Sequence, residues 1–398
     1  MVTRNNPSFQ VVHLSTSHTG GAGIAARRLN QVLNSRDFSS VFYAIDRKDY
    51  APKASEYVIG RSLATRIKGL PALWLTKYLT DFSFFSLIST SAVSNSWLKN
   101  LVSNGTTILH IHNWFNLLSQ RQLVSLVKSG VPIVITMHDQ RFMTGGCHYA
   151  SNCEGLYSGC QSCPITPYVL SPIPQRNSKR ILSVLRADST KIKVIAPSKY
   201  LVNEAHKSLS LRNVEVLHIP NVLPTDFALD FQRTTNNQPE QSYLVGVASM
   251  NPFDFIKGGD IIEEMISDPM LSLQNISFSM LADFAPECHR DFWSSVDCLL
   301  VPSRADNSPN VIHEAKAYGV PIIASDAGGI PESLSLLVDV VIPVANLSSE
   351  TILEAIVFMQ KRKHSEENSM VAQEDFKNYT GGAIDKLIAI YSKLLTSK

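Results

Sequence analysis

Two carboxylates, Asp306 and Glu314, stand eight positions apart in the stretch SRADNSPNVIHEAKAYGVPIIASDAGGIPE. N-cap residues precede the proline in DNSP and a glycine follows AKAY, so the pattern predicts a helix over residues 309–318. Asp306 then lies in the loop before this helix. Glu314 lies beside the buried face of the helix, where a carboxylate needs a partner. The pair suits a ligand site; the alternative is that Asp306 is a turn residue and Glu314 a charge at the helix rim.

The segments around this helix add groups that suit a phosphorylated ligand. The apolar run VPIIAS predicts a buried parallel strand, and the loop DAGGIPE after it contains Gly328 and Gly329, which let the backbone approach a ligand closely. Lys257 stands in FIKGGD before an amphipathic helix, where an ammonium group can neutralise a pyrophosphate. A solvated lysine at a turn is the alternative. Together with the acidic pair, these residues outline a nucleotide-sugar site.

A second glycine-rich loop, TSHTGGAGIAARRL, follows the first apolar run of the chain. Backbone N–H groups at such a helix start can bind a phosphate. Gly21, Gly23 and Ala26 also satisfy the dinucleotide fingerprint, with Asp46 closing the next strand, which makes an NAD-dependent oxidoreductase a rival interpretation. Five polar residues separate the strand from the first glycine, however, and this longer loop favours room for a sugar or phosphate. A plain glycine turn is the third interpretation.

Histidines end two predicted strands of the N-terminal half. His110 and His112 in TTILHIHNW share one face of a strand because they are two residues apart, and His112 is nearer the strand end. The run VPIVITMHDQ sets His138 and Asp139 at the end of another strand of the same sheet. We expect at least one of these histidines to touch substrate, with His138 and Asp139 on the acceptor side. The alternative is that they are hydrogen-bonded structural residues.

Four of the six cysteines lie close together in CHYASNCEGLYSGCQSC, as Cys147, Cys153, Cys160 and Cys163. In a reducing compartment a C-x5-C-x6-C-x2-C pattern favours four thiolates on a structural zinc over disulfides. Only the C-x2-C end has ordinary zinc-ligand spacing, so thiols without a metal, or a disulfide formed under stress, are the alternatives.

Composition places the chain among globular proteins. Its 398 residues are 44% hydrophobic and 18% charged, enough for two domains, and the formal net charge of +2 argues against a nucleic-acid partner. The N-terminal apolar run is too short for a signal peptide and no apolar run is long enough to span a bilayer, which predicts a cytoplasmic protein. Residues 61–93 mix basic, aromatic and aliphatic side chains, as in peripheral contact with the inner face of the membrane or in helices around a lid.

Apolar runs alternate with helical patterns along the whole chain, which predicts parallel sheets covered on both faces. We expect an α/β protein with two doubly wound, Rossmann-like domains facing a central cleft. The N-terminal domain is predicted to bind the acceptor and the C-terminal domain the nucleotide sugar. The predicted boundaries are 1–190 and 191–380, with a C-terminal helix in 381–398 that packs back on the first domain.

The stretch 303–332 resembles the acidic pair of the retaining glycosyltransferases of family 4, which are two-domain GT-B enzymes. Their signature is two glutamates separated by seven residues, then a helix, G-x-P-(V/I)-(V/I)-A-(S/T) and GG-x-P-E. The resemblance covers most of the chain, through GGAGIAARRL, HIHNW, MHD, APSKYL, IPN, KGGD and VPS. The section TGGCHYASNCEGLYSGCQSCP is similar to a branch that assembles colanic acid and other bacterial exopolysaccharides or O-antigens.

The resemblance implies transfer of a sugar from a UDP- or GDP-sugar to a lipid-linked or other glycan acceptor, with retention at the anomeric carbon. It implies no cofactor for catalysis, because a lysine and helix-terminal N–H groups can stabilise the departing diphosphate. The roles carried over are ribose binding for Glu314, the donor sugar and diphosphate for Asp306, the diphosphate for Lys257, the phosphates or sugar for Gly328 and Gly329, the loop that closes on the donor for Gly21, and the reacting centre for His112.

Two departures from the family pattern concern the same site. The first acid is Asp306 in place of the commoner glutamate, so its reach is one methylene shorter. No arginine precedes Lys257 in VASMNPFDFIKGG, where many family members carry one. A non-catalytic subunit that binds nucleotide sugar is therefore the alternative from a different class.

Overall fold

The computed structural model describes most of the chain as two compact units, 1–224 with 382–398, and 225–381. Asp46, Cys288 and nearly all of 61–93 lie outside the described residues. No helix in the described part has both the length and the apolar composition to cross a bilayer. The described residues are 9–45, 51–60, 89, 91–150, 153–187, 190–224, 227–228, 242–249, 251, 253–269, 271, 274–283, 289–362 and 366–396.

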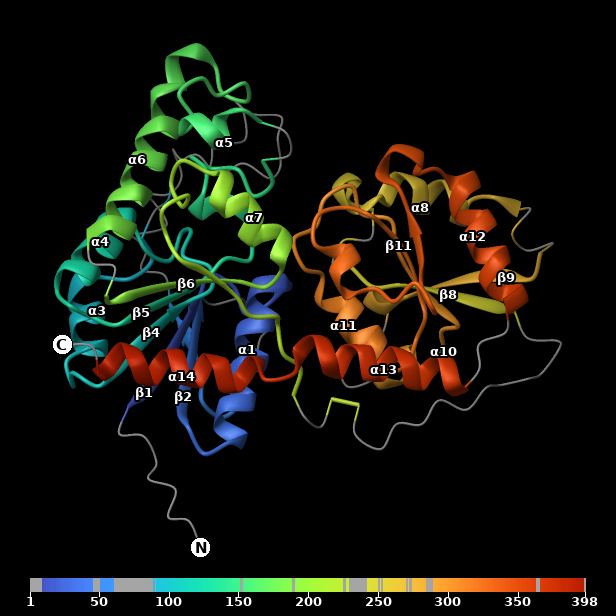
Figure 1. The fold of residues 1–398 in the computed structure, drawn as a ribbon, viewed down its shortest axis with the longest axis horizontal. Coiled ribbons are helices and arrows are strands. Elements are labelled where there is room, and N and C mark those ends of the chain that lie inside the picture. Colours follow the sequence, from blue (N-terminus) through green and yellow to red (C-terminus); the bar gives the residue numbers. More distant parts are fainter. Residues whose placement is uncertain are drawn as a thin grey trace, which may run out of the picture. The chain divides into compact units, whose positions relative to one another are not determined.

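The first unit is built on a parallel sheet whose strands are continuous apolar runs, as expected for a sheet buried on both faces (Figure 1). Strand order reverses between β1 and β4, which makes this point the topological switch of the sheet. The strands, in spatial order, are β3 (Glu56–Ile59), β2 (Ser39–Ile45), β1 (Gln10–Ser15), β4 (Thr107–Ile111), β5 (Ile133–Thr136), β6 (Ile192–Ala196) and β7 (Val216–His218).

Helices cover both faces of this sheet. One face packs against α3 (Asn95–Leu101), α4 (Gln120–Lys128), α6 (Pro172–Ala187) and α7 (Lys199–Lys207). The other face packs against α1 (Gly20–Ser35) and α14 (Ala383–Thr396), the last helix of the chain.

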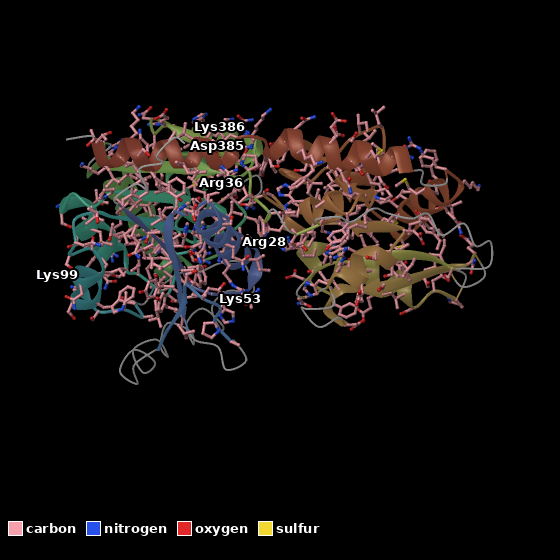
Figure 2. All side chains as sticks on the ribbon, turned by 90° about the horizontal axis from the view of Figure 1, so that it is seen from below. Arg28, Arg36, Lys53, Lys99, Asp385 and Lys386 are labelled. Carbon is pink, nitrogen blue, oxygen red and sulfur yellow. The ribbon has the colours of Figure 1, made fainter. Side chains whose placement is uncertain are left out.

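The packing of α14 ties the C-terminus of the chain to the first unit. Tyr391 is fully buried and its hydroxyl lies 2.6 Å from His110 Nδ1. At the other end of the helix, Arg36 Nη1 donates to Asp385 Oδ1 at 2.6 Å (Figure 2). The Arg36–Asp385 pair is exposed and contributes at most about 1 kcal/mol, so the buried face of α14 does most to hold the helix.

The first unit extends past the boundary predicted at residue 190. β6 pairs with β5 and β7 pairs with β6, so residues 191–224 complete the first sheet, and the second unit begins at Thr225. The predicted boundary is wrong because an apolar run followed by a helical pattern looks the same whichever sheet the strand joins.

The second unit has its own parallel sheet, in which strand order reverses between β8 and β10. α8 (Gly259–Ile266) and α12 (Ser349–Arg362) cover one face, and α10 (His289–Ser295) and α11 (Asn310–Ala317) cover the other (Figure 1). The helix predicted over 309–318 is α11, and Gly319 after it is left-handed at φ 64°. The strands, in spatial order, are β12 (Val340–Ile342), β11 (Ile322–Ser325), β10 (Cys298–Val301), β8 (Tyr243–Val247) and β9 (Ile276–Met280).

Two interactions fix α11, the helix that carries Glu314. Its Lys316 forms a fully buried ion pair with Asp339, with Nζ and Oδ2 3.2 Å apart, while Asp339 also accepts the N–H group of Ile322 at the start of β11. Burial raises the pKa of Asp339, although the Lys316 ammonium opposes this rise. On its outer side α11 packs against α13 (Glu366–Thr380), whose side chains donate to the backbone at the end of α11.

Candidate active site

Lys257 and Asp306 meet at the switch point of the second sheet. Lys257 follows β8 and Asp306 follows β10, the two strands between which the order reverses. Ligands of open parallel sheets bind at this position, outside the carboxyl ends of the strands. Lys257 Nζ lies 2.5 Å from Asp306 Oδ2. The lysine side chain is 28% exposed and the aspartate side chain 11%, so a ligand can reach both groups.

The turn that carries Lys257 is held from both sides. Within the turn, Asp254 Oδ1 accepts the N–H group of Ile256 at 2.9 Å. From the loop after β10, Arg304 donates from two nitrogens to Asp260 at 2.6 and 2.8 Å and lies over the Phe255 ring, 4.0 Å from its centroid. Arg304 was not identified from the sequence, because its partner Asp260 is 44 positions away and no motif links them.

Gly258 completes this turn in a conformation that other residues rarely adopt. Its φ is +76°, and a Cβ atom built on it would lie 2.2 Å from the carbonyl oxygen of Pro302. We expect Gly258→Ala to destabilise the second unit by about 2 kcal/mol, from the left-handed conformation and the displaced loop. Urea unfolding checks this value. Gly60→Ala is the matched control, since a Cβ there meets nothing within 4 Å; equal effects in the two variants would contradict the expectation.

The loop after β11 joins the same site. Gly329 donates its N–H group to the backbone carbonyl of Asp306 at 3.0 Å, and Gly328 is left-handed at φ 57°. Asp306 Oδ1 also accepts the N–H group of Ser308 at 3.1 Å. The structure therefore brings together four residues predicted from the sequence, Lys257, Asp306, Gly328 and Gly329. Glu314 lies buried on α11, the helix that follows the Asp306 loop.

In the first unit a chain of hydrogen-bonded imidazoles crosses the switch point between β1 and β4. His112 Nε2 lies 3.0 Å from His13 Nδ1, and His112 Nδ1 lies 3.0 Å from His138 Nε2. His110 stacks on His112 but bonds to Tyr391 and to Thr136 Oγ1. The sequence did not single out His13. A polar residue in the middle of the apolar run that forms β1 could have drawn attention to it, since β1 pairs with β4 and His13 lies beside His110.

Burial keeps these histidines neutral. It lowers the pKa of His13 to about 3 and of His138 to about 4, and it holds the pKa values of His110 and His112 well below the ordinary value. Neutral imidazoles can donate and accept hydrogen bonds but bring no positive charge. Ligand atoms of His13, His110 and His112 lie within 4.8 Å of one another. The ring nitrogens of His110 and His112 all have hydrogen-bond partners, which favours a hydrogen-bonded cluster over a metal centre.

Asp139, the residue after His138, forms an ion pair with Arg141. Its Oδ2 lies 2.5 Å from Arg141 Nη2, and its Oδ1 accepts the backbone N–H group of Arg141 at 2.9 Å. Burial acts to raise the pKa of Asp139, but Arg141 and His148 more than offset it and the pKa is lowered. Asp139 is therefore a stable anion that fixes Arg141.

Gly21 lies in the exposed first turn of α1, with Gly23 and Ala26 further along the helix. A Cβ atom on Gly23 would lie 2.3 Å from the carbonyl oxygen of Ser17. This contact explains the glycine at position 23 by close packing of the helix on the preceding loop, without a dinucleotide.

The four predicted zinc ligands gather around the short helix α5 (Gly155–Ser158). Burial and the neighbouring thiols of Cys160, Cys163 and Cys153 raise the pKa of Cys147, and burial raises that of Cys160 to about 11. In a four-thiolate zinc site the sulfur atoms lie about 3.8 Å apart. Among the described residues no three of these sulfurs lie within 4.8 Å of one another. The residues are thus clustered but do not form a closed zinc site, and zinc binding stays a prediction.

Comparison with solved structures identifies the fold class as GT-B, the fold of two-domain glycosyltransferases. Sucrose-phosphate synthase from Thermosynechococcus elongatus matches with a TM-score of 0.64 at 15% identity, covering 98% of this chain and 100% of that one. HepE from Anabaena, solved in complex with UDP, matches with a TM-score of 0.54 at 15% identity, over 96% and 98% of the two chains.

Sequence comparison also finds similarity to glycosyltransferases. Residues 270–360, from before β9 into α12, match the family model described as "Glycosyl transferases group 1". Over 373 residues the chain is 22% identical to the "Putative colanic acid biosynthesis glycosyl transferase WcaC" of Escherichia coli strain K12, covering 85% of this chain and 89% of that protein. Part of the second unit is thus similar to group 1 glycosyltransferases, and most of the chain is similar to a protein named as a glycosyl transferase.

Proposed function

We propose that this protein is a retaining glycosyltransferase of family 4, which moves a sugar from a UDP- or GDP-sugar to a lipid-linked or other glycan acceptor in bacterial surface-polysaccharide assembly. The observation that carries the proposal is the Lys257–Asp306 pair at the switch point of a GT-B unit. A relative named for colanic acid biosynthesis and a structural neighbour bound to UDP support the polysaccharide and the donor class. Retention follows from the resemblance of the acidic pair.

In this reaction the bond between the anomeric carbon and the diphosphate oxygen breaks, and the acceptor hydroxyl oxygen bonds to the same carbon. The hydroxyl proton leaves with the nucleoside diphosphate. Negative charge develops on that leaving group, and the Lys257 ammonium can transfer its contact from Asp306 to the diphosphate. Glu314 binds the ribose hydroxyls in this scheme. No metal takes part.

The remaining predicted residues have roles within the same proposal. Gly21 belongs to the loop that approaches the donor, and its place in the first turn of α1 offers backbone N–H groups there. His112 serves the reacting centre as a neutral imidazole at the end of β4. We place the enzyme in the cytoplasm, with residues 61–93 in peripheral contact with the inner face of the membrane.

The test is a thermal-shift screen of the full chain against UDP, GDP, their common sugar conjugates and NAD(H). A ligand at one hundred times its dissociation constant stabilises by about 2.7 kcal/mol, which is easily measured. We expect a selective shift with one nucleoside diphosphate and its sugars. A shift with NAD(H) alone would overturn the proposal in favour of an oxidoreductase. Donor binding without turnover on any lipid-linked acceptor would indicate a non-catalytic subunit.

The ribose assignment predicts the effect of one substitution. Glu314→Ala should weaken donor binding by about 2 kcal/mol, roughly 30-fold in Kd, because a buried hydrogen bond to a charged group is lost. Titration calorimetry with the donor nucleotide measures it. Glu350→Ala, at an exposed position of α12, is the control. Unchanged affinity in folded Glu314→Ala would rule out the assignment.

A further inference from the structure

A cavity of about 290 Å³ lies within the first unit, and every residue that lines it belongs to that unit. Most of its lining comes from the loop after β4, the start of α4, the TGGC loop (residues 144–147) and α6, and Ser89 and Arg141 complete it. The residues that decide its chemistry are Trp114, Phe115, Arg121, Arg141, Asn177 and Arg180.

The lining is positively charged. Arg121, Arg141 and Arg180 all face the cavity, and among the described residues that line it there is no acid. Asp139 balances the charge of Arg141. Arg121 and Arg180 are exposed, and neither has an ion-pair partner among the described residues. Two uncompensated positive charges at one cavity are a marked concentration in a chain whose formal net charge is +2.

Arg141 is held in a fixed orientation at this cavity. Its Nε and Nη2 atoms bind Asp139 Oδ2 at 2.8 and 2.5 Å, and its guanidinium carbon lies 5.4 Å from the centroid of the Phe115 ring. Nη1 has no hydrogen-bond partner among the described residues and remains able to donate. A guanidinium group held in this way can bind a phosphate or carboxylate oxygen without first losing rotamer freedom.

An aromatic wall lies next to the arginines. The Trp114 and Phe115 rings meet edge to face, with centroids 6.0 Å apart, and both line the cavity. Aromatic faces pack against the C–H faces of a sugar ring, whereas the arginines favour an anionic group. The combination fits a sugar that carries a negative charge better than it fits a neutral sugar or a bare ion.

The TGGC loop lines the cavity and is fixed by hydrogen bonds and close packing at Gly145. Gly145 donates its N–H group to Cys160 Sγ at 3.2 Å and accepts from Asn177 Nδ2 at 3.0 Å. A Cβ atom at Gly145 would lie 2.3 Å from the carbonyl oxygen of Pro174, so only glycine lets α6 approach this closely. The cysteine cluster thus has a structural consequence, because Cys160 fixes the loop on which the cavity is built.

We propose that this cavity binds a sugar bearing a phosphate or a carboxylate group, and that this anionic sugar is part of the acceptor. The assignment to the acceptor rests on the proposed glycosyltransferase function; the binding of an anionic sugar does not. Arg121 and Arg180 bind the negative group, and Trp114 and Phe115 hold the ring.

Calorimetric binding of three matched probes to the full chain tests the inference: glucose 1-phosphate, glucuronate and glucose. We expect the two charged probes to bind at millimolar concentration and glucose to bind more weakly. The double variant Arg121→Gln, Arg180→Gln should lose charged-probe affinity by about tenfold or more, since each arginine contributes a charge-assisted hydrogen bond. Arg212→Gln, at an exposed position outside the cavity, is the control and should bind the probes as the unaltered chain does.

The outcomes separate this inference from the proposed function. Preference for glucose 1-phosphate would indicate a glycosyl phosphate, and preference for glucuronate an acidic sugar. Failure of both charged probes to bind, equal binding of glucose, or unchanged affinity in the double variant would overturn the inference. The nucleoside diphosphate shift should be intact in the double variant. If no nucleotide binds while the charged probes do, the anionic-sugar site stands and the glycosyltransferase function fails.

Discussion

Replacing Lys257 by methionine should lower kcat/KM for sugar transfer by about 100- to 1,000-fold, the range found when one group that stabilises a developing negative charge is removed. In the unliganded protein the ammonium group of Lys257, whose side chain is 28% exposed, pairs with Asp306, and a partly exposed ion pair contributes about 1 kcal/mol to folding. The variant should therefore fold normally. Steady-state kinetics with the donor found in the nucleotide screen, together with urea unfolding, measures both quantities.

Two further variants make this prediction specific. Lys207→Met removes a lysine that also pairs with a carboxylate, Glu204 at 2.8 Å, but lies on α7 of the first unit, and it should leave transfer unchanged. Asp306→Asn removes the negative charge beside Lys257, so nucleoside diphosphate should bind at least as tightly as before while turnover falls. Near-normal activity in a well-folded Lys257→Met protein would show that the lysine does not stabilise the leaving group.

Sequence patterns were sufficient to predict those features of the fold that depend on residues close together in the chain. The alternation of apolar runs and helical patterns predicted two doubly wound units, and glycines at helix and strand ends located the loops of the candidate site. The sequence grouped Lys257 and Asp306 as residues of one candidate site but did not predict their direct contact. That contact depends on the adjacency of β8 and β10, between which β9 lies in sequence.

Long-range pairing accounts for what the sequence did not reveal. Arg304 binds Asp260, and Lys316 binds Asp339, through contacts that depend on the final packing of α8, α11 and β11. His13 looked like an ordinary residue of a buried strand until β1 and β4 paired and placed it beside His112. The domain boundary failed for the same reason, since membership of a sheet is decided by strand pairing that no local pattern encodes.

Acidification from pH 7 to pH 5 should destabilise the first unit by about 4 kcal/mol through two buried histidines alone. Burial lowers the pKa of His13 to about 3 and of His138 to about 4, against an ordinary value of 6.5. Below pH 6.5 the unfolded chain binds protons at these histidines that the folded chain excludes. Their contribution to stability is therefore fully present above pH 6.5 and is lost as the pH falls toward their pKa values in the folded protein. Each histidine then costs about 2 kcal/mol at pH 5.

The other shifted groups either act at lower pH or reinforce the same effect. The lowered pKa values of Asp139 and Asp260 affect stability only near and below the ordinary aspartate value of 3.8. His110, His112 and His148, whose pKa values burial also lowers, reinforce the loss between pH 7 and pH 5. Urea unfolding at pH 7 and pH 5 measures the free energy of unfolding at each pH, and the difference between the two values is the predicted loss.

The decisive comparison is between His138→Gln and His206→Gln. The first should reduce the pH-dependent loss by about 2 kcal/mol, because one proton-binding site disappears from the unfolded chain. The second replaces an exposed histidine of α7 and should leave the loss unchanged. Any packing defect of the glutamine lowers stability equally at both pH values, so only the difference between them reports on the excluded proton. If the loss of stability between pH 7 and pH 5 were the same in His138→Gln as in the unaltered chain, His138 would have to take up its proton in the folded protein as well.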